Sequence, residues 1–576
     1  RRLKDSILVL DSLGAILQGS FIQAQVAEVQ EMGFELKTGQ RPYYLKIGKD
    51  YVDLRLSAAE KQLHRPAEID PEVAADSAQV KLFEVRDLIR FRQYELAEMK
   101  LKELMLMQRP SLPLYLEQAK LAWFKMNYQQ CYDYARQALS VDAYQGEANY
   151  YYGLAALKIG RENDAQDGFE VASLDPAWRS AAYLQLAKYY YRIKQYESAF
   201  GYSVRSLQAN GLNIDALQLQ CLLQLKYGLG KGQEPAAVLA EHDPFNTFMQ
   251  FETNKKIRSR QEFASEKIME LAVWYADLNE YERAADVLVQ AKQTPETLCW
   301  LAWLTRMDPA ASQEWIAQAE VSSAAFVFPF REESEAIFQW MKERSTSWKV
   351  DYLLALLYRF RNQPQKGQQL LANVQHEPQD FAAYYALKSS LNAVDHIPLA
   401  VKEMQQACRV APDEWRYGLH LVELQNQQAA FAGALKNSTA YHKKFPDNYI
   451  LTLAHIRTLL LNRDYASAER ELQGVEILPF EGATEGHRYF VQAKLMLAYQ
   501  YILQKKYAEA SQKLQESRLW PINLGAGEPY DSEKNELLAD WLSAYLKKQA
   551  SDQEGEQHLL KKIVANKKTK NSYELL

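Results

Sequence analysis

Cysteine is scarce in this sequence, and no two cysteines lie close together. Four occur among 576 residues, namely Cys131, Cys221, Cys299 and Cys408. Because neighbouring cysteines are separated by 78 residues or more, they form neither the close pairs of a zinc site nor the dense framework of a disulfide-stabilised domain. We therefore expect no metal and no cofactor. This usage fits a reducing cytoplasm, and it fits equally a periplasmic protein that makes no disulfides.

Long apolar runs and a strong net charge are absent too. No uninterrupted apolar stretch approaches the ~20 residues of a membrane-spanning helix, so we expect no membrane span. Lysine and arginine total 68 against 73 acidic residues, and the net charge of −5 gives the chain as a whole no attraction to nucleic acid. The lysines between Lys561 and Lys570 are interpreted as a solvated end. With 48% hydrophobic and 24% charged residues, the composition is that of a globular protein.

Motifs of catalysis are missing as well. The sequence contains no Walker motif, HExxH, GxSxG or EF-hand loop. The glycines from Gly228 to Gly232 lack the ending of a phosphate-binding loop and are predicted to form a turn, whereas Asn523 to Tyr530 is predicted to be a rigid turn that packs Trp520 and Tyr530. The histidines are scattered singly, and we assign them no role. We expect no catalytic residue in this chain, while the activity of a longer protein is a separate question.

The first residues have the two-residue period of β-strands. Up to about Leu56, apolar and polar residues alternate between turn signals such as Asp11 to Gly14. The chain begins with two arginines rather than with a methionine or a signal peptide, so we expect it to start inside a longer protein. We predict a short antiparallel β segment over 1–66, the end of a truncated β-sandwich, with a linker around His64 to Pro71.

Beyond the linker, small residues recur with a period of 34. Such residues mark the points where packed helices approach most closely, because only a short side chain fits there. Two series have this period, and they are Ala97, Cys131, Ala165 and Ala199, then Ala400, Ala434 and Ala468. A third series lies twelve positions before the first and consists of Val85, Ala119, Gly153 and Ala187. The predicted fold is mostly α, a superhelical α-solenoid of roughly nine to eleven helix pairs after the β segment.

Changes of phase divide the helical part into three. We predict a first repeat block over 67–240, degenerate helical repeats over 241–350, and a second block over 351–576 that ends in capping helices. Proline, glycine and aromatic insertions break the phase in the degenerate part. There, Phe326 to Phe330 is an apolar run through which the array could form homo-oligomers, or which fills a gap between repeats.

The repeating residues resemble the tetratricopeptide repeat, and the best match runs from Tyr152 and Gly153 to Pro176. A closer resemblance rests on three segments, EANYYYGLAALKIGRENDAQDGFEVASLDPAWRSAAYLQLA, EHDPFNTFMQFE and ESRLWPINLGAGEPYDSEKNELLADWL. They look like a family of large bacterial proteins in which a mutarotase-like β-sandwich region and a domain of unknown function precede a tetratricopeptide array. The resemblance implies that 1–66 is the end of that β region, that carbohydrate-related work lies upstream, and that the compartment is a bacterial cytoplasm or periplasm.

The first helix of each pair is expected to face the concave side of the superhelix. On these helices basic and aromatic side chains alternate, and the predicted basic-aromatic stripe consists of Arg86, Arg90, Lys120, Trp123, Lys158, Lys188, Tyr191 and Arg192. Its cations suit an acidic peptide or a terminal carboxylate through charge-assisted hydrogen bonds, and its rings equally suit a sugar. In the alternative interpretation the tyrosines pack between repeats and the lysines only solvate the surface.

Together these patterns favour a non-catalytic protein-protein interaction scaffold that binds a protein or peptide segment in its concave groove. The alternative is a scaffold or oligomerisation arm of a larger carbohydrate-active or carbohydrate-binding protein whose active domain lies upstream. The first hypothesis rests on phase and groove chemistry, and the second rests on the resemblance alone.

Overall fold

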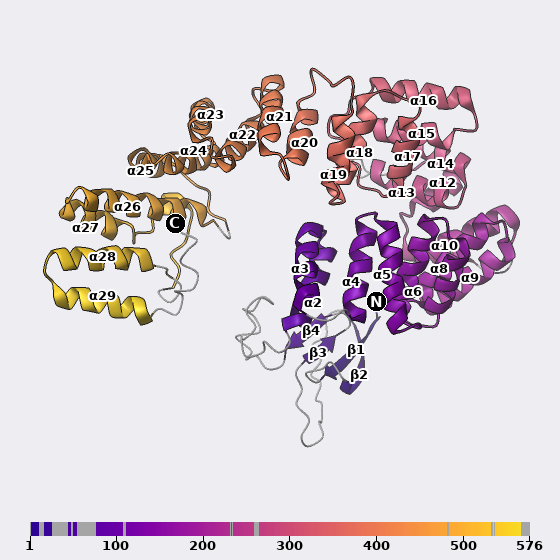
Figure 1. Ribbon diagram of the computed structural model, residues 1–576. Helices are drawn as coiled ribbons and strands as arrows, with labels where there is room; N and C mark the ends of the chain where they lie inside the picture. Colours follow the sequence, from indigo (N-terminus) through magenta and orange to yellow (C-terminus); the bar gives the residue numbers. More distant parts are fainter. Residues whose placement is uncertain are drawn as a thin grey trace. The chain divides into compact units, whose positions relative to one another are not determined.

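The computed structural model describes most of the chain, in two compact units (Figure 1). The described residues are 2–10, 16–25, 44–47, 50–53, 77–107, 111–230, 232, 234–257, 264–480, 483–530, 534 and 536–565. The first unit comprises residues 1–117 and the second residues 118–576. The predicted linker around His64 to Pro71 and the lysines after Ala565 lie outside the described residues.

The first unit contains a four-stranded antiparallel sheet. Its strands are β1 (Arg2–Leu10), β2 (Ile16–Gln25), β3 (Tyr44–Ile47) and β4 (Asp50–Asp53), in the order β2-β1-β3-β4. β1 pairs with β2 from Arg2 opposite Gln25 to Leu10 opposite Ile16. Both edges of the sheet are formed by hairpin partners, as expected where consecutive strands are joined by short connections.

Two helices complete the first unit, α2 (Ser77–Arg90) and α3 (Tyr94–Met107), and α4 (Leu112–Phe124) begins in it. The predicted small residues Val85 and Ala97 are both 0% exposed, as is Leu104. These side chains form the contact between the two antiparallel helices, which is what the 34-residue series predicts.

The second unit continues as helix pairs. Its first part contains α5 (Tyr128–Val141), α6 (Gly146–Lys158), α7 (Glu162–Ala172), α8 (Arg179–Arg192), α9 (Tyr196–Ala209), α10 (Ile214–Tyr227), α11 (Pro235–His242) and α12 (Thr247–Asn254). Its middle contains α13 (Ala264–Asp277), α14 (Tyr281–Leu288), α15 (Pro295–Leu304), α16 (Pro309–Val321), α17 (Glu333–Lys342), α18 (Trp348–Phe360) and α19 (Pro364–Ala372).

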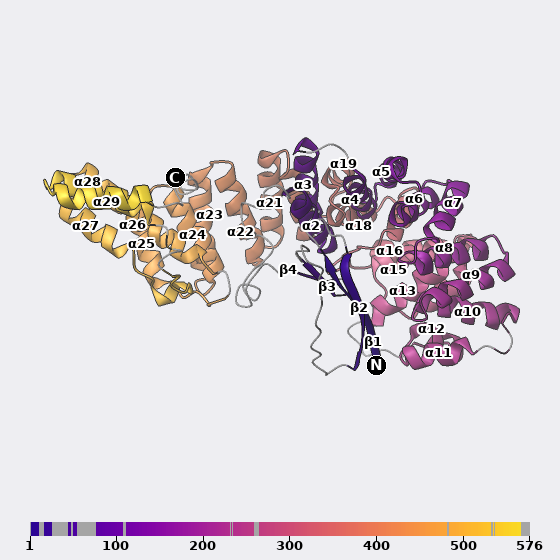
Figure 2. The same ribbon diagram turned by 90° about the horizontal axis from the view of Figure 1, so that it is seen from below.

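The last part follows the same pattern, and its successive pairs stack side by side (Figure 2). It contains α20 (Ala382–Asn392), α21 (Ile397–Val410), α22 (Trp415–Gln427), α23 (Phe431–Lys444), α24 (Tyr449–Leu461), α25 (Tyr465–Gly474), α26 (Glu485–Leu503), α27 (Tyr507–Glu516), the 3-10 turn η3 (Ile522–Leu524), α28 (Leu537–Gln549) and α29 (Gln553–Ala565). The described part of the chain is therefore mostly helical, and consecutive helices pack against each other as pairs.

The turn inside most of the described pairs contains a residue in the left-handed backbone region. In the first block four such residues are again 34 apart, and they are Arg92, Met126, Gly160 and Lys194, with φ between 56° and 76°. Arg463 follows Ala429 at the same interval in the second block. Glycine is the residue that adopts this conformation without a steric penalty, yet only one of the four first-block positions carries it.

One apolar core joins the parts that the sequence separates. It extends from Met126 to Leu424 and includes Trp300, whose side chain is 2% exposed. The helices of the predicted degenerate part thus share a core with the regular repeats on either side. Within Phe326 to Phe330, Val327 and Pro329 are buried, whereas Phe326 and Phe328 are 93% and 66% exposed.

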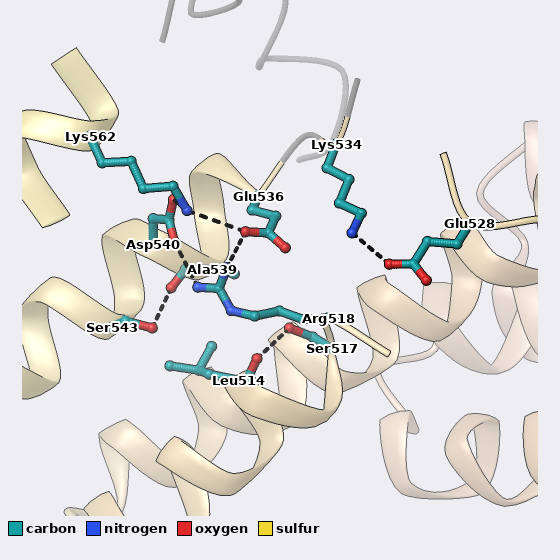
Figure 3. A network of polar contacts seen from close by, with 10 residues as sticks. All are labelled: Leu514, Ser517, Arg518, Glu528, Lys534, Glu536, Ala539, Asp540, Ser543 and Lys562. Carbon is teal, nitrogen blue, oxygen red and sulfur yellow. Dashed lines mark hydrogen bonds and ion pairs between the residues drawn. The ribbon is translucent and has the colours of Figure 1, made fainter. Parts of the chain in front are cut away.

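Ion pairs connect the final helices to the array. Asp540 on α28 lies 2.7 Å from Nη2 of Arg518 and 2.9 Å from Nζ of Lys562 on α29, and Glu536 joins the same cluster (Figure 3). Asp540 is 5% exposed, so this carboxylate requires both cations. These ion pairs hold α28 and α29 in place. They are the last helices that the structure describes.

Candidate functional site

The predicted basic-aromatic stripe is distributed over both units. Arg86 and Arg90 lie on α2 in the first unit, and the other six residues lie in the second. Nε of Arg86 is 2.6 Å from Oε1 of Glu117, and the guanidinium of Arg90 lies 5.9 Å from the centre of the Phe91 ring. Both arginines are solvent-exposed.

The stripe residues on α4 and α6 contact one another and nearby acids. Nζ of Lys120 is 3.0 Å from Oε1 of Glu147. Nζ of Lys158 lies 6.0 Å from the Trp123 ring centre, and it pairs with Oε1 of Glu332 at 3.1 Å. Glu332 directly precedes α17, so this ion pair joins two segments that are 174 residues apart in the sequence.

The stripe residues on α8 are paired as well. Asp277, the last residue of α13, lies 3.1 Å from Nζ of Lys188 and 3.2 Å from Nη1 of Arg192. Burial favours the neutral amine of Lys188, but Asp277 and Asp215 outweigh it and raise the pKa of this lysine. Lys188 is therefore held charged beside its acids.

Tyr191 is not a surface platform. Its side chain is 2% exposed, and its hydroxyl donates a hydrogen bond of 2.6 Å to Oε1 of Glu280. Burial and the neighbouring Glu280 both raise the pKa of this hydroxyl, and Lys226 completes the cluster with a 2.6 Å contact to the same carboxylate. For Tyr191 the alternative interpretation of the sequence, packing between repeats, describes the observed position.

Lys158, Lys188 and Arg192 of the predicted stripe are thus paired with acids from later in the same chain. Asp277, Glu280 and Glu332 supply the carboxylates, and Nη1 of Arg361 donates a 3.1 Å hydrogen bond to the carbonyl of Phe124 on α4. The sequence identified the cations but not their partners. The spacing of acidic residues within a degenerate repeat does not indicate which distant lysine each of them will contact.

A second concave surface, which the sequence did not reveal, lies between α22, α24 and α26. It is a hollow of about 230 Å³. The helices supply Val422, Leu453 and Arg457, among others, and the connection between α25 and α26 supplies Ile477 and Phe480. The only signal in the sequence is that this connection is longer than the turns of the regular repeats.

The glycine-rich segment Asn523 to Tyr530 supports that hollow. Nδ2 of Asn523 donates hydrogen bonds to the carbonyls of Leu472 at 3.0 Å and Val475 at 2.9 Å, and the amide of Ile477 donates to the carbonyl of Asn523 at 2.8 Å. Trp520 stacks on His487 with ring centres 3.4 Å apart, but Tyr530 is 82% exposed. The predicted packing of Tyr530 is therefore wrong, because the chain turns its ring to solvent.

The described part of the chain brings together no group of three or more His, Cys, Asp or Glu side chains that could hold a metal. Among the described helices, none combines the length and the apolar character needed to cross a membrane.

Comparisons with known proteins give the following. No family model matches the sequence. No curated protein matches it either. The chain is similar in part to several solved structures. One is the C-terminal part of a TPR repeat-containing protein from Cytophaga hutchinsonii, with 14% identity over 43% of this chain and 93% of that one and a TM-score of 0.26. The pilus biogenesis factor PilW has 17% identity over 45% and 97%, with a TM-score of 0.26. A tetratricopeptide repeat protein from Parabacteroides merdae has 11% identity over 49% and 98%, with a TM-score of 0.24.

Proposed function

We propose that this chain is a non-catalytic scaffold that binds an acidic segment of a partner protein on the inner wall of its first repeat block. One observation carries the proposal. Lys158, Lys188 and Arg192 each contact a carboxylate brought by a distant segment of the same chain. The wall therefore has the chemistry that recognises carboxylates, and a partner would use it by displacing the internal acids.

Competition of this kind has a clear electrostatic basis. Charge-assisted hydrogen bonds between lysine or arginine and carboxylates are stronger than neutral ones, and they are weakened by salt when they are exposed. Lys188 and Arg192 are 12% and 20% exposed, so water screens them only in part. A flexible acidic segment offers several carboxylates at once, whereas here Asp277 is shared by both cations and Asp215 contacts only Lys188, at 3.9 Å.

The test is affinity capture with the full chain in a lysate of its source cell. A partner should be retained by the wild type and lost by the triple variant Lys120→Ala, Lys188→Ala, Arg192→Ala. The control triple Arg136→Ala, Arg205→Ala, Lys443→Ala removes the same charge from exposed positions on α5, α9 and α23, and it should retain the partner.

A second pair of substitutions separates binding from folding. Asp277→Asn with Glu332→Gln removes the internal competitors and keeps every cation, so we expect it to strengthen capture while the triple variant weakens it. Equal capture by the wild type and both variants would contradict a binding role for this wall.

The alternative proposal is that the array is the scaffold or oligomerisation arm of a larger bacterial protein that acts on or binds carbohydrate through an upstream domain. It is supported by the sequence resemblance and by the position of the sheet β1–β4 before the helices. A bacterial cytoplasmic or periplasmic location belongs to the same proposal. Glycan turnover by a longer version of the protein, insensitive to Lys188→Ala and Arg192→Ala, would favour it over the partner-binding wall.

A further inference from the structure

We infer that the hollow between α22, α24 and α26 is a second binding site, which takes one large apolar side chain of a partner peptide beside a carboxylate that pairs with Arg457. This site is distinct from the inner wall of the first block, and the inference does not depend on binding there.

The hollow is built by more than the repeat itself. Two segments close it, residues 475–480 of the connection after α25 and the turn η3, and the hydrogen bond between Ile477 and Asn523 ties these segments together. Packing is tight behind the lining, because a Cβ on Gly486 would lie 2.4 Å from Cδ1 of Ile477. Gly525 has φ +69° and its Cβ position lies 2.8 Å from the carbonyl oxygen of Ile477. The loops therefore form a fixed wall and not a loose cover.

Size and lining point to an apolar side chain. Pockets for complete small-molecule ligands occupy about 300 to 1,000 Å³, and this hollow has about 230 Å³. Val422, Leu453 and Leu524 line its buried surface. At its rim, Phe480 is 59% exposed and Ile450 is 38% exposed. A side chain entering the hollow would cover these two rim residues as well, which adds apolar burial.

Charge selects the neighbouring group on the partner. Glu423 lies 3.1 Å from Nδ1 of His420, and Glu485 accepts a hydrogen bond from Tyr489, so both acids that line the hollow have partners. Arg457 also lines it and is exposed, and within the described residues it forms no ion pair. The cation without a counter-ion favours a carboxylate on the peptide, because a guanidinium can bind both oxygens at once.

A polar atom in the lining is also unsatisfied. Asn426 is 9% exposed, and its Nδ2 donates a hydrogen bond of 2.8 Å to Oγ1 of Thr458. Its Oδ1 accepts no hydrogen bond from the described residues. Buried polar atoms normally have a partner. Because this oxygen is itself buried, it is not an acceptor for a bound peptide, and the proposal rests on the apolar lining and Arg457.

The test uses an array of immobilised nine-residue peptides and the labelled full chain. The central residue is Leu, Phe or Ala, and one neighbouring position is Glu, Gln or Lys, on a Gly/Ser background. We expect retention to need both a large apolar centre and Glu, with about tenfold weaker binding when either is replaced.

Charge reversal makes the assignment specific. Arg457→Glu should move the preference from Glu-containing to Lys-containing peptides, whereas Arg470→Glu, an exposed arginine on α25, should leave it unchanged. Ala454→Phe should fill the hollow and abolish the preference for a large centre, and Ala466→Phe on the exposed side of α25 is its control. Since Arg457 is exposed and unpaired, its variant should fold normally.

The two sites can be told apart by the outcome. Retention lost with Lys188→Ala and Arg192→Ala but unaffected by Arg457→Glu would place the peptides on the first block and overturn this inference. No retention of any peptide, or a preference for Glu that survives Arg457→Glu, would overturn it too. Capture on the first block is measured separately, so the proposed scaffold function stands or falls by its own experiment.

Discussion

At the scale of single residues, the small side chains of the repeats are set by contact with a neighbouring helix. Gly153 on α6 faces the ring of Phe169 on α7, and a Cβ at this glycine would lie 2.7 Å from Cε1 of that ring. Phe169 is 1% exposed and cannot move into solvent. Glycine at position 153 is therefore required by its packing against Phe169. The turn between the two helices of a pair does not require glycine.

Replacing glycine by alanine should consequently have opposite effects at two helical positions. Gly153→Ala should lower the free energy of unfolding by about 1–3 kcal/mol through overpacking. Gly201→Ala on α9, where nothing lies within 4 Å of the added Cβ, should raise it by about 0.5–1 kcal/mol. Urea unfolding followed by circular dichroism measures both, and the same sign for the two substitutions would contradict the packing argument.

One carboxylate of the last repeats, Glu516, contributes to stability against acid. Oε2 of Glu516 lies 2.5 Å from Nζ of Lys494 and 3.0 Å from Nζ of Lys513. Burial opposes ionisation of Glu516, but hydrogen bonds from Lys494, Lys513 and Gln512 outweigh it and lower its pKa from 4.5 to about 2. A carboxyl whose pKa is lower in the folded state stabilises the fold fully above pH 4.5 and loses that contribution as the pH falls toward 2.

We therefore expect Glu516→Gln to lower the melting temperature at pH 7 and to make its decline between pH 4.5 and pH 2 shallower than in the wild type. Melting curves recorded at half-unit pH steps give both effects. Glu509→Gln is the matched control, since Glu509 is exposed on the same helix α27. Parallel declines for wild type and Glu516→Gln would show that this carboxylate does not titrate with folding.

The sequence could predict the small residues but not their ionic neighbours. Packing recurs with each repeat, so Ala97, Cys131 and Ala165 stand in phase, and all three are buried. Asp277 and Glu332 meet Lys188 and Lys158 because the superhelix brings distant repeats together, and no local period records that approach. The sequence thus predicts the residue types of the stripe but not their ionic surroundings. It does not predict the hollow between α22, α24 and α26, because segments outside the repeat helices close it.

At the scale of elements, the turn within most of the described helix pairs repeats a left-handed residue. Lys194, between α8 and α9, is exposed and has φ 64°, and Gly160 has φ 76° at the equivalent place between α6 and α7. A side chain in the left-handed region costs about 1–2 kcal/mol relative to glycine. The chain tolerates that cost because the amide of Lys194 donates to the carbonyl of Tyr191 at 3.0 Å and the helices on either side fix the turn.

Exchanging the residue types at these two turns should shift stability in opposite directions. Lys194→Gly should gain up to about 1 kcal/mol, less than the full steric cost because glycine also makes the unfolded chain more flexible. Gly160→Ala should lose about 1 kcal/mol, since its Cβ has free space and only the backbone conformation opposes it. Chemical denaturation measures the free energy of unfolding of both variants. If the turn were without strain, Lys194→Gly would destabilise the protein.

At the scale of the whole second unit, ion pairs hold segments that are distant in the sequence against one another. Lys158 at the end of α6 and Glu332 before α17 form the pair with the longest separation among those of the stripe. Reversing one charge of this pair should separate the two segments. Reversing both charges should bring the two segments together again. Amide hydrogen exchange at the end of α6 and the start of α17 reports that separation directly, and it is independent of any partner.

We expect Lys158→Glu and Glu332→Lys each to speed exchange at both segments, and the double variant to return exchange toward the wild-type rate, with a coupling energy of about 0.5–3 kcal/mol. Swapping Lys547 and Asp552, a 2.8 Å pair at the turn between α28 and α29, is the control and should leave both segments unchanged. Additive effects of the two reversals would mean that the pair does not form in solution. Lys158 would then be open to a partner without its internal competitor, and Glu332→Gln would add nothing to the gain in capture that Asp277→Asn gives.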